Sequence, residues 1–158
     1  MKNPRTPVLC LFVVLFCMDS FAQTPAADRI NEPNYNKPRL FSGLPDNIPV
    51  SIESLSSLLY KPVGEEISVG LAGGEQFVFE GKIVSTTTKY GNSIQSVVVR
   101  STNFNGAVLS FSKITNADKS NSFTGRIVSL QHGDLYELKN QNGQFVMAKK
   151  NFYDLVNE

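Results

Sequence analysis

The sequence predicts a mostly β domain, an antiparallel sandwich or small barrel of about seven strands with one short N-terminal helix. Three observations lead to this prediction. From Glu65 onward, apolar and polar residues alternate with the period of two that is typical of half-buried strands. Asn-Gly and Gly-Gly pairs, which favour tight hairpin turns, separate the alternating runs. A seven-residue motif occurs twice, which predicts that two three-stranded repeats build the domain.

The N-terminus predicts export. Lys2 and Arg5 precede an apolar run from Val8 to Met18. That run is as long as a signal-peptide core and too short to span a bilayer, and Ala22 suits the position before a cleavage. We therefore expect residues 1–22 to be a signal peptide and the mature protein to be periplasmic, secreted or at the cell surface. We expect no transmembrane span in the mature chain.

Two alternatives for this segment remain open, and both would anchor the protein to a membrane. The apolar run could stay uncleaved, or a lipid could be attached to Cys17, although Phe16 is bulkier than the residue that usually precedes a lipidated cysteine. Both cysteines, Cys10 and Cys17, lie in this segment. Cleavage after Ala22 would therefore exclude disulfides, thiol catalysis and cysteine-based metal sites from the mature chain.

The charge balance excludes the usual route to nucleic-acid binding. Removal of residues 1–22 from the 158-residue chain leaves 136 residues and takes away Lys2, Arg5 and Asp19. The basic count falls from 15 to 13 and the acidic count from 14 to 13, so the formal net charge becomes zero. Proteins that neutralise phosphates normally carry a clear basic excess. We therefore expect no nucleic-acid partner.

The region before the strands divides into a tether, an irregular segment and a helix. Residues 23–38 contain three prolines and three asparagines, which predicts a flexible tether to a single all-β domain over residues 39–158. Residues 39–50 read as irregular. Ser51 is a plausible N-cap for a short helix that closes one end or edge of the core. The apolar positions that share one face of this helix are Ile52, Leu55, Leu58 and Leu59.

The remaining elements are strands joined by turns. The predicted strands lie around Ile67–Leu71, Phe77–Thr86, residues 94–102, Ala107–Phe111, residues 122–130, Leu135–Leu138 and Gln144–Lys150. Three pairs are predicted hairpin turns: Gly73-Gly74, Asn105-Gly106 and Asn142-Gly143. Residues 151–156 are predicted to form one helical turn docked by Phe152 and Leu155.

The internal repeat is the most specific feature of the sequence. Residues 79–85, Phe-Glu-Gly-Lys-Ile-Val-Ser, recur as residues 123–129, Phe-Thr-Gly-Arg-Ile-Val-Ser. The repeats extend over approximately 77–115 and 121–150. We interpret them as two three-stranded units that face each other and bury one apolar face each. The structural residues of the motif are then equivalent in pairs: Phe79 with Phe123, Gly81 with Gly125, and Ile83 with Ile127. In the alternative interpretation the two glycines open a binding groove.

No complete catalytic set is visible. His132, the only histidine, lies in a predicted turn, and its candidate acid–base partners are Asp134 and Glu137. No motif specifies a nucleophile, and one histidine with scattered carboxylates falls short of a metal site. We predict no catalytic residue, no cofactor and no metal site, while these three residues remain the candidates for an acid–base reaction.

A resemblance adds one functional alternative. The order of a Phe-x-Gly motif, an alternating strand, a Gly-x-Ile motif and the run Tyr136-Glu137-Leu138 resembles prodomains of secreted zinc metalloproteases. The resemblance covers about half of the mature chain and includes no cysteine switch. It implies a protease inhibitor or prodomain-like protein, without assigning roles to residues.

Three functional hypotheses follow from the sequence. The leading one is a non-enzymatic binding or interaction module of the cell envelope or the secreted fraction, with a protein or an envelope glycan as partner. The second is the protease inhibitor or prodomain-like protein. The third is a small hydrolase or lyase that uses His132, which requires Asp134 or Glu137 to share a pocket with it.

Overall fold

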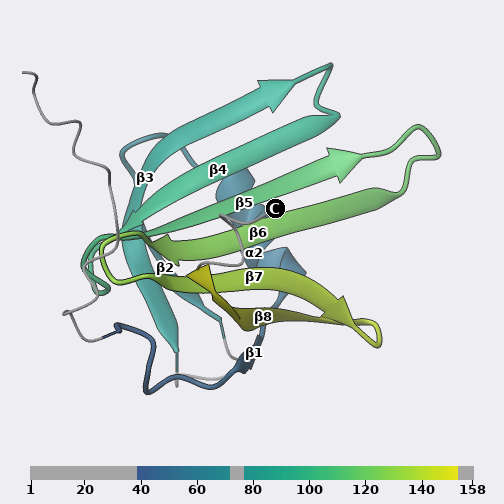
Figure 1. Cartoon of the computed structure of the whole chain (residues 1–158). Coiled ribbons are helices and arrows are strands. Elements are labelled where there is room, and N and C mark those ends of the chain that lie inside the picture. Colours follow the sequence, from purple (N-terminus) through teal and green to yellow (C-terminus); the bar gives the residue numbers. More distant parts are fainter. Residues whose placement is uncertain (1–38, 72–76, 153–158) are drawn as a thin grey trace, which may run out of the picture. The chain divides into compact units, whose positions relative to one another are not determined.

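The chain folds into a mostly β structure built on one antiparallel sheet. The computed structural model describes residues 39–71 and 77–152, all of which belong to one compact unit. Eight strands follow one another in the order β1-β8-β7-β6-β5-β4-β3-β2. The sheet curls into a half-barrel, and one short helix lies against it (Figure 1). No helix among the described residues is long and apolar enough to cross a membrane.

The elements have the following bounds. The helical elements are α2 (Ile52–Ser57) and the 3-10 turn η2 (Leu58–Tyr60). The strands are β1 (Asn47–Pro49), β2 (Glu66–Gly70), β3 (Val78–Lys89), β4 (Ile94–Ser101), β5 (Ala107–Thr115), β6 (Asn121–Ser129), β7 (Asp134–Gln141) and β8 (Gln144–Asn151).

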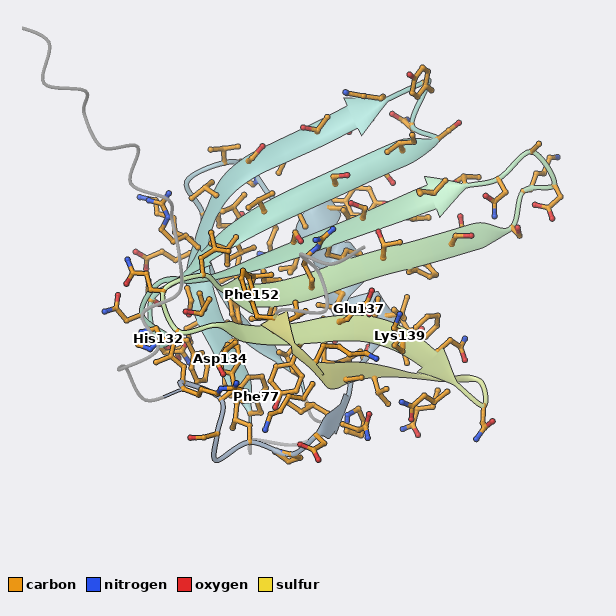
Figure 2. The ribbon with its side chains drawn as sticks, in the orientation of Figure 1. Phe77, His132, Asp134, Glu137, Lys139 and Phe152 are labelled. Atoms are coloured by element: carbon orange, nitrogen blue, oxygen red, sulfur yellow. The ribbon has the colours of Figure 1, made fainter. Side chains whose placement is uncertain are left out.

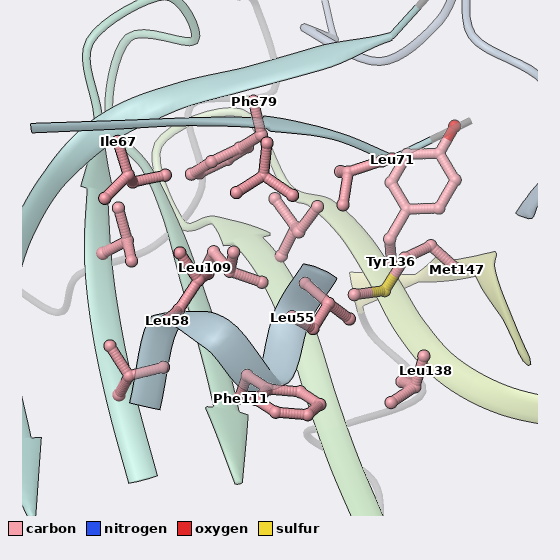
Figure 3. Packing of buried hydrophobic residues seen from close by; sticks show 14 of the residues in the cluster. Leu55, Leu58, Ile67, Leu71, Phe79, Leu109, Phe111, Tyr136, Leu138 and Met147 are labelled. Carbon is pink, nitrogen blue, oxygen red and sulfur yellow. The ribbon is translucent and has the colours of Figure 1, made fainter. Parts of the chain in front are cut away.

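The predicted helix and its cap are confirmed. The Ser51 side chain accepts a hydrogen bond from the backbone N–H of Ser54 at 3.1 Å, which satisfies one of the free donors at the start of α2. Leu55 and Leu58 are fully buried, as their spacing on one helical face predicts. Their side chains point toward those of the sheet, including Leu109 and Phe111 (Figure 3). The helix therefore covers the inner face of the curled sheet.

The period-two pattern correctly predicts which strand residues form the core. On β2, Ile67 and Val69 are buried and their neighbours are exposed. On β3, Phe79 and Ile83 are buried, whereas Lys82 is exposed. The same alternation brings Ala107, Leu109 and Phe111 of β5 into the core. These inner-face residues and the helix together make one continuous apolar cluster.

The described strands number eight rather than about seven. The additional strand is β1, which pairs with β8 and lies inside the segment 39–50 that the sequence predicts to be irregular. It has only three residues and ends in Pro49, and only its central residue, Ile48, reaches the core. A three-residue strand that ends in proline has too few positions to show an alternating pattern.

The prediction that two facing three-stranded repeats build the domain is not confirmed, because residues 77–115 and 121–150 lie next to each other in one sheet. The first of these segments contains β3, β4 and β5, the second contains β6, β7 and β8, and β5 pairs directly with β6. Phe79 is fully buried, but its counterpart Phe123 is only partly buried and stacks on Phe111 with ring centroids 6.0 Å apart. The apolar face is closed by the curl of the sheet and by α2, so the two phenylalanines have different surroundings.

Of the three predicted hairpin turns, one is confirmed as a two-residue hairpin, and a second is a turn within a longer connection. Asn142 and Gly143 both have positive φ, 53° and 87°, as a two-residue turn between β7 and β8 requires. Asn105 and Gly106 form a turn that is closed by the Ala107 N–H donating to the Phe104 carbonyl at 2.9 Å, and Gly106 has a positive φ of 75°. The whole connection between β4 and β5 is nevertheless longer than a two-residue hairpin. Ser101 organises that loop, because its hydroxyl accepts a hydrogen bond from the N–H of Phe104 at 2.9 Å. Gly73-Gly74 and residues 153–156 of the predicted C-terminal turn lie outside the described residues.

Candidate binding surface on the outer face of the sheet

The candidate acid–base residues lie at two places along β7 and the loop before it. His132 is partly buried in the loop between β6 and β7, where its backbone N–H donates to the carbonyl of Ser129 at 3.2 Å. Figure 2 shows His132 and Asp134 at one end of β7, with Glu137 farther along the strand. Asp134 and Glu137 are three positions apart, so their side chains leave opposite faces of the strand.

Asp134 has a structural partner. Its side chain is only 5% exposed, and Oδ2 accepts a hydrogen bond from the backbone N–H of Leu40 at 2.7 Å. This contact joins two residues that are 94 positions apart in the chain. The carboxylate therefore fastens the segment before β1 to the end of β7.

Glu137 belongs to a solvent-accessible ion pair on the outer face. Its Oε2 lies 2.7 Å from the Lys139 ammonium, and the two side chains are 40% and 46% exposed. Glu137 also lines a hollow of about 370 Å³ together with Thr124 and Arg126. An exposed pair of this kind contributes little to stability. It gives the outer face a mixed charge near Arg126, its register partner on β6.

The described residues contain no group of three or more histidine, cysteine, aspartate or glutamate side chains that could hold a metal ion. A cluster of that size is the usual minimum for a protein metal site.

A largely apolar hollow lies on the outer face of the sheet. Val108 on β5 and Val128 on β6 are register partners, so their side chains lie next to each other. Their chain neighbours Leu109 and Ile127 are fully buried in the core, which places the two valines on the opposite, outer face. Both valines line a hollow of about 580 Å³.

The rest of this hollow comes from the ends of β6 and β8 and from two loops. Leu130, which follows β6, is 46% exposed and is one of the large apolar side chains that the described surface leaves open. Arg126 adds a positive charge to the lining. The full set of lining residues is Gly106, Val108, Arg126, Val128, Leu130, Gln131 and Phe152, and we call this set the outer hollow.

Sequence reasoning missed the outer hollow because it assigned each strand one apolar face. The signal was present in the repeat motif, where Ile127 and Val128 are consecutive apolar residues that must point to opposite faces. Val128 and Leu130 then continue the apolar pattern on the outer face. In the first repeat, the residue equivalent to Val128 is Val84, which is 38% exposed.

Comparison of the chain with protein-family models, with curated proteins and with solved structures finds no match in any of the three. The fold defines a mostly β protein with one curled antiparallel sheet, and its function has to be argued from its own surfaces.

Proposed function

We propose that this protein is an exported, non-enzymatic binding module and that it takes an apolar segment of a partner protein into the outer hollow. The observation that carries the proposal is the exposure of Leu130 beside Val108 and Val128, on a face that strands normally give to polar residues. Exposed apolar clusters with a polar rim are typical of interaction sites.

The surroundings of the acid–base candidates support a binding role over catalysis. The Asp134 carboxylate is nearly buried and accepts the Leu40 N–H, so it holds two chain segments together. Glu137 leaves the other face of β7 and pairs with Lys139. A general acid–base pair needs both groups within reach of one substrate atom.

The lining of the outer hollow favours a protein partner over a glycan. The burial of valine and leucine side chains against an apolar partner lowers the free energy, and these side chains offer no hydrogen bonds to sugar hydroxyls. Arg126 would place a guanidinium beside the apolar floor, where it can bind a carboxylate in a bidentate manner. We therefore propose an apolar partner segment that carries an acidic side chain.

Site-directed photo-cross-linking in the exporting cell tests this proposal. A photoreactive residue at Gln131, inside the outer hollow, should yield a defined protein adduct. The same residue at Ala117, on the exposed connection between β5 and β6, should not. Leu130→Asp should abolish the Gln131 adduct, because it places a charge on the apolar floor. An adduct of equal yield from Ala117, or one that survives Leu130→Asp, would exclude the outer hollow as the binding site.

A further inference from the structure

Strand β3 extends well beyond its outer neighbour. It has twelve residues, whereas β2 has five and pairs only with residues 78–82. Just before β2, Gly64 and Glu65 exchange hydrogen bonds with Ile83, at 2.8 and 2.9 Å. From Val84 to Lys89, no described residue pairs with the outer side of β3, which forms the upper border of the sheet in Figure 1.

The alternation of the backbone identifies the groups on this open edge. The Ser93 carbonyl accepts from Thr115 on the β5 side, so Ile94, Ser96 and Val98 turn their N–H and C=O groups toward β3. Their register partners on β3 are Lys89, Thr87 and Ser85. The remaining residues of this stretch, Thr86 and Thr88, therefore direct their N–H and C=O groups away from the sheet.

The two edges of the sheet differ in how they are protected. At the other edge, β1 is three residues long, ends in Pro49 and has Pro45 two residues before its start, features that discourage pairing with another chain. The open part of β3 reads Val-Ser-Thr-Thr-Thr-Lys over residues 84–89, with no proline or glycine and with one charge, that of Lys89 at its end. A register shift between Ile83 and Ser85 leaves Val84, the first residue of this stretch, without a partner on β4, whereas residues 85–89 are regularly paired.

We infer that two copies of this protein pair through the open edge of β3, antiparallel and with the two-fold axis at Thr87. In this arrangement Thr87 faces Thr87 of the second copy, and Thr86 faces Thr88 of the second copy. The outward N–H and C=O groups of Thr86 and Thr88 then form four hydrogen bonds between the copies.

The side chains of the open part of β3 favour a second copy of this protein as the partner that pairs with it. All three central cross-strand pairs are threonine with threonine, a combination that packs and hydrogen-bonds well on a sheet surface. Lys89 falls opposite Ser85 of the second copy, so no two like charges meet in this register. The dimer is isologous and closes on itself, because each copy contributes the same edge and leaves no further pairing site on β3.

A single cysteine tests the register directly. Thr87→Cys is made in a chain whose only cysteines, Cys10 and Cys17, are replaced by alanine, and the protein is purified after export. Facing residues that are not hydrogen-bonded to each other have Cα atoms about 4.5 Å apart, which is within disulfide range. With oxidised glutathione, the Thr87→Cys variant should form a disulfide-linked dimer at least ten times faster than Thr124→Cys, an exposed threonine on β6.

Sedimentation equilibrium tests the association itself. The wild-type protein should dimerise reversibly as its concentration rises from micromolar to about millimolar. Thr86→Lys with Thr88→Lys brings like charges face to face and should raise the dissociation constant at least tenfold. The control, Thr124→Lys with Gln144→Lys, adds the same charge at exposed positions away from β3 and should leave the constant unchanged.

Three results would overturn the inference. A wild-type protein that stays monomeric to millimolar concentration has no such pairing. A dimer that the lysine pair on β3 does not weaken uses another surface. Equal disulfide rates for Thr87→Cys and Thr124→Cys would place the axis away from Thr87. The inference does not depend on the outer hollow, whose cross-linking result can succeed or fail independently.

Discussion

The phenolic hydroxyl of Tyr136 donates a hydrogen bond to the backbone carbonyl of Pro45 at 2.6 Å, across 91 positions of the chain. Asp134, two residues earlier on the same face of β7, accepts the N–H of Leu40. These two polar side chains hold the segment that leads into β1 against the end of the sheet. Polar contacts from β7 therefore position a segment whose own sequence has no strand pattern.

The Tyr136–Pro45 contact predicts a measurable loss of stability. Tyr136→Phe removes the donor and leaves the Pro45 carbonyl without this partner, while the buried ring stays in place. We expect the free energy of unfolding to fall by about 0.5–1.5 kcal/mol, the usual net contribution of one hydrogen bond. Urea unfolding at neutral pH measures this difference. A variant as stable as the wild type would show that water replaces the phenol at no cost.

The same residue predicts a loss of stability at alkaline pH. Burial, together with the negative charges of Asp46 and Asp134, raises the pKa of Tyr136 from 10.0 to about 12. Because the folded pKa lies above the unfolded one, this contribution is fully present below pH 10 and is lost as the pH rises through about 12. Tyr136→Phe should be free of this loss. Parallel alkaline unfolding curves for the two proteins would contradict the prediction.

The equivalent phenylalanines of the repeat should differ in their contributions. Phe79 is fully buried and packs near Phe104, with centroids 6.3 Å apart, so Phe79→Ala should cost about 3–5 kcal/mol. Phe123 is only partly buried, and Phe123→Ala should cost roughly half as much. The exposed residues Lys82 and Arg126 should each tolerate alanine within about 0.5 kcal/mol. Denaturant unfolding of the four variants compares them. Equal costs for both phenylalanines would support the symmetric core that the sequence predicts.

These phenylalanines also show how far the sequence predicts the fold. The period-two pattern predicts which face of each strand is buried, because alternation is a property of one strand alone. The inner positions of β2, β3 and β5 and the N-cap at Ser51 follow from such local patterns. Whether two repeats face each other or adjoin depends on the pairing of β5 with β6, which no local pattern encodes. The same limit explains why the partly exposed state of Phe123 was missed.

The candidate site was less predictable than the fold. Composition and motifs drew attention to His132, Asp134 and Glu137, because acid–base chemistry needs such residues. Whether a carboxylate is free depends on distant backbone groups, and the Leu40 N–H that binds Asp134 is invisible in the local sequence. The outer hollow depends on Val108 and Val128 being register partners, which is again a property of the fold.

His132→Ala should leave binding nearly unchanged. The residue lies in the connection between β6 and β7, and the proposed binding function uses the outer hollow instead. The photoreactive residue at Gln131 is introduced both with and without His132→Ala. The yield of the protein adduct should be the same in the two proteins. A loss of any catalytic activity beyond about a hundredfold, the scale of a general acid or base, would favour the hydrolase or lyase hypothesis.

Export should remove residues 1–22. The positive start, the short apolar run and Ala22 predict a mature chain that begins at Gln23. Intact-mass measurement of the exported protein identifies its first residue. A chain that starts at Cys17 with the added mass of a lipid would establish the anchored alternative, and an unprocessed chain would establish the uncleaved one.

Gly81 and Gly125 occupy the same position of the repeated motif, but the space around them differs. A Cβ at Gly81 would lie 2.5 Å from the carbonyl oxygen of Arg100 and 2.7 Å from a methyl group of Val99. Backbone and a fully buried valine cannot move aside easily, so Gly81→Ala should cost about 1–3 kcal/mol through overpacking. A Cβ at Gly125 would lie 3.3 Å from the carbonyl oxygen of Ser110, so a shift of a few tenths of an ångström suffices.

Gly125→Ala should therefore be close to neutral, because alanine also loses about 0.5–1 kcal/mol less conformational entropy than glycine on entering a strand. Urea unfolding of both variants at one pH measures the difference directly, with each glycine as the matched control for the other. Equal destabilisation by the two alanines would show that the motif imposes the same close packing in both repeats. A larger loss of stability for Gly125→Ala than for Gly81→Ala would contradict the wider spacing around Gly125. The tighter approach of neighbouring strands would then lie in the second repeat.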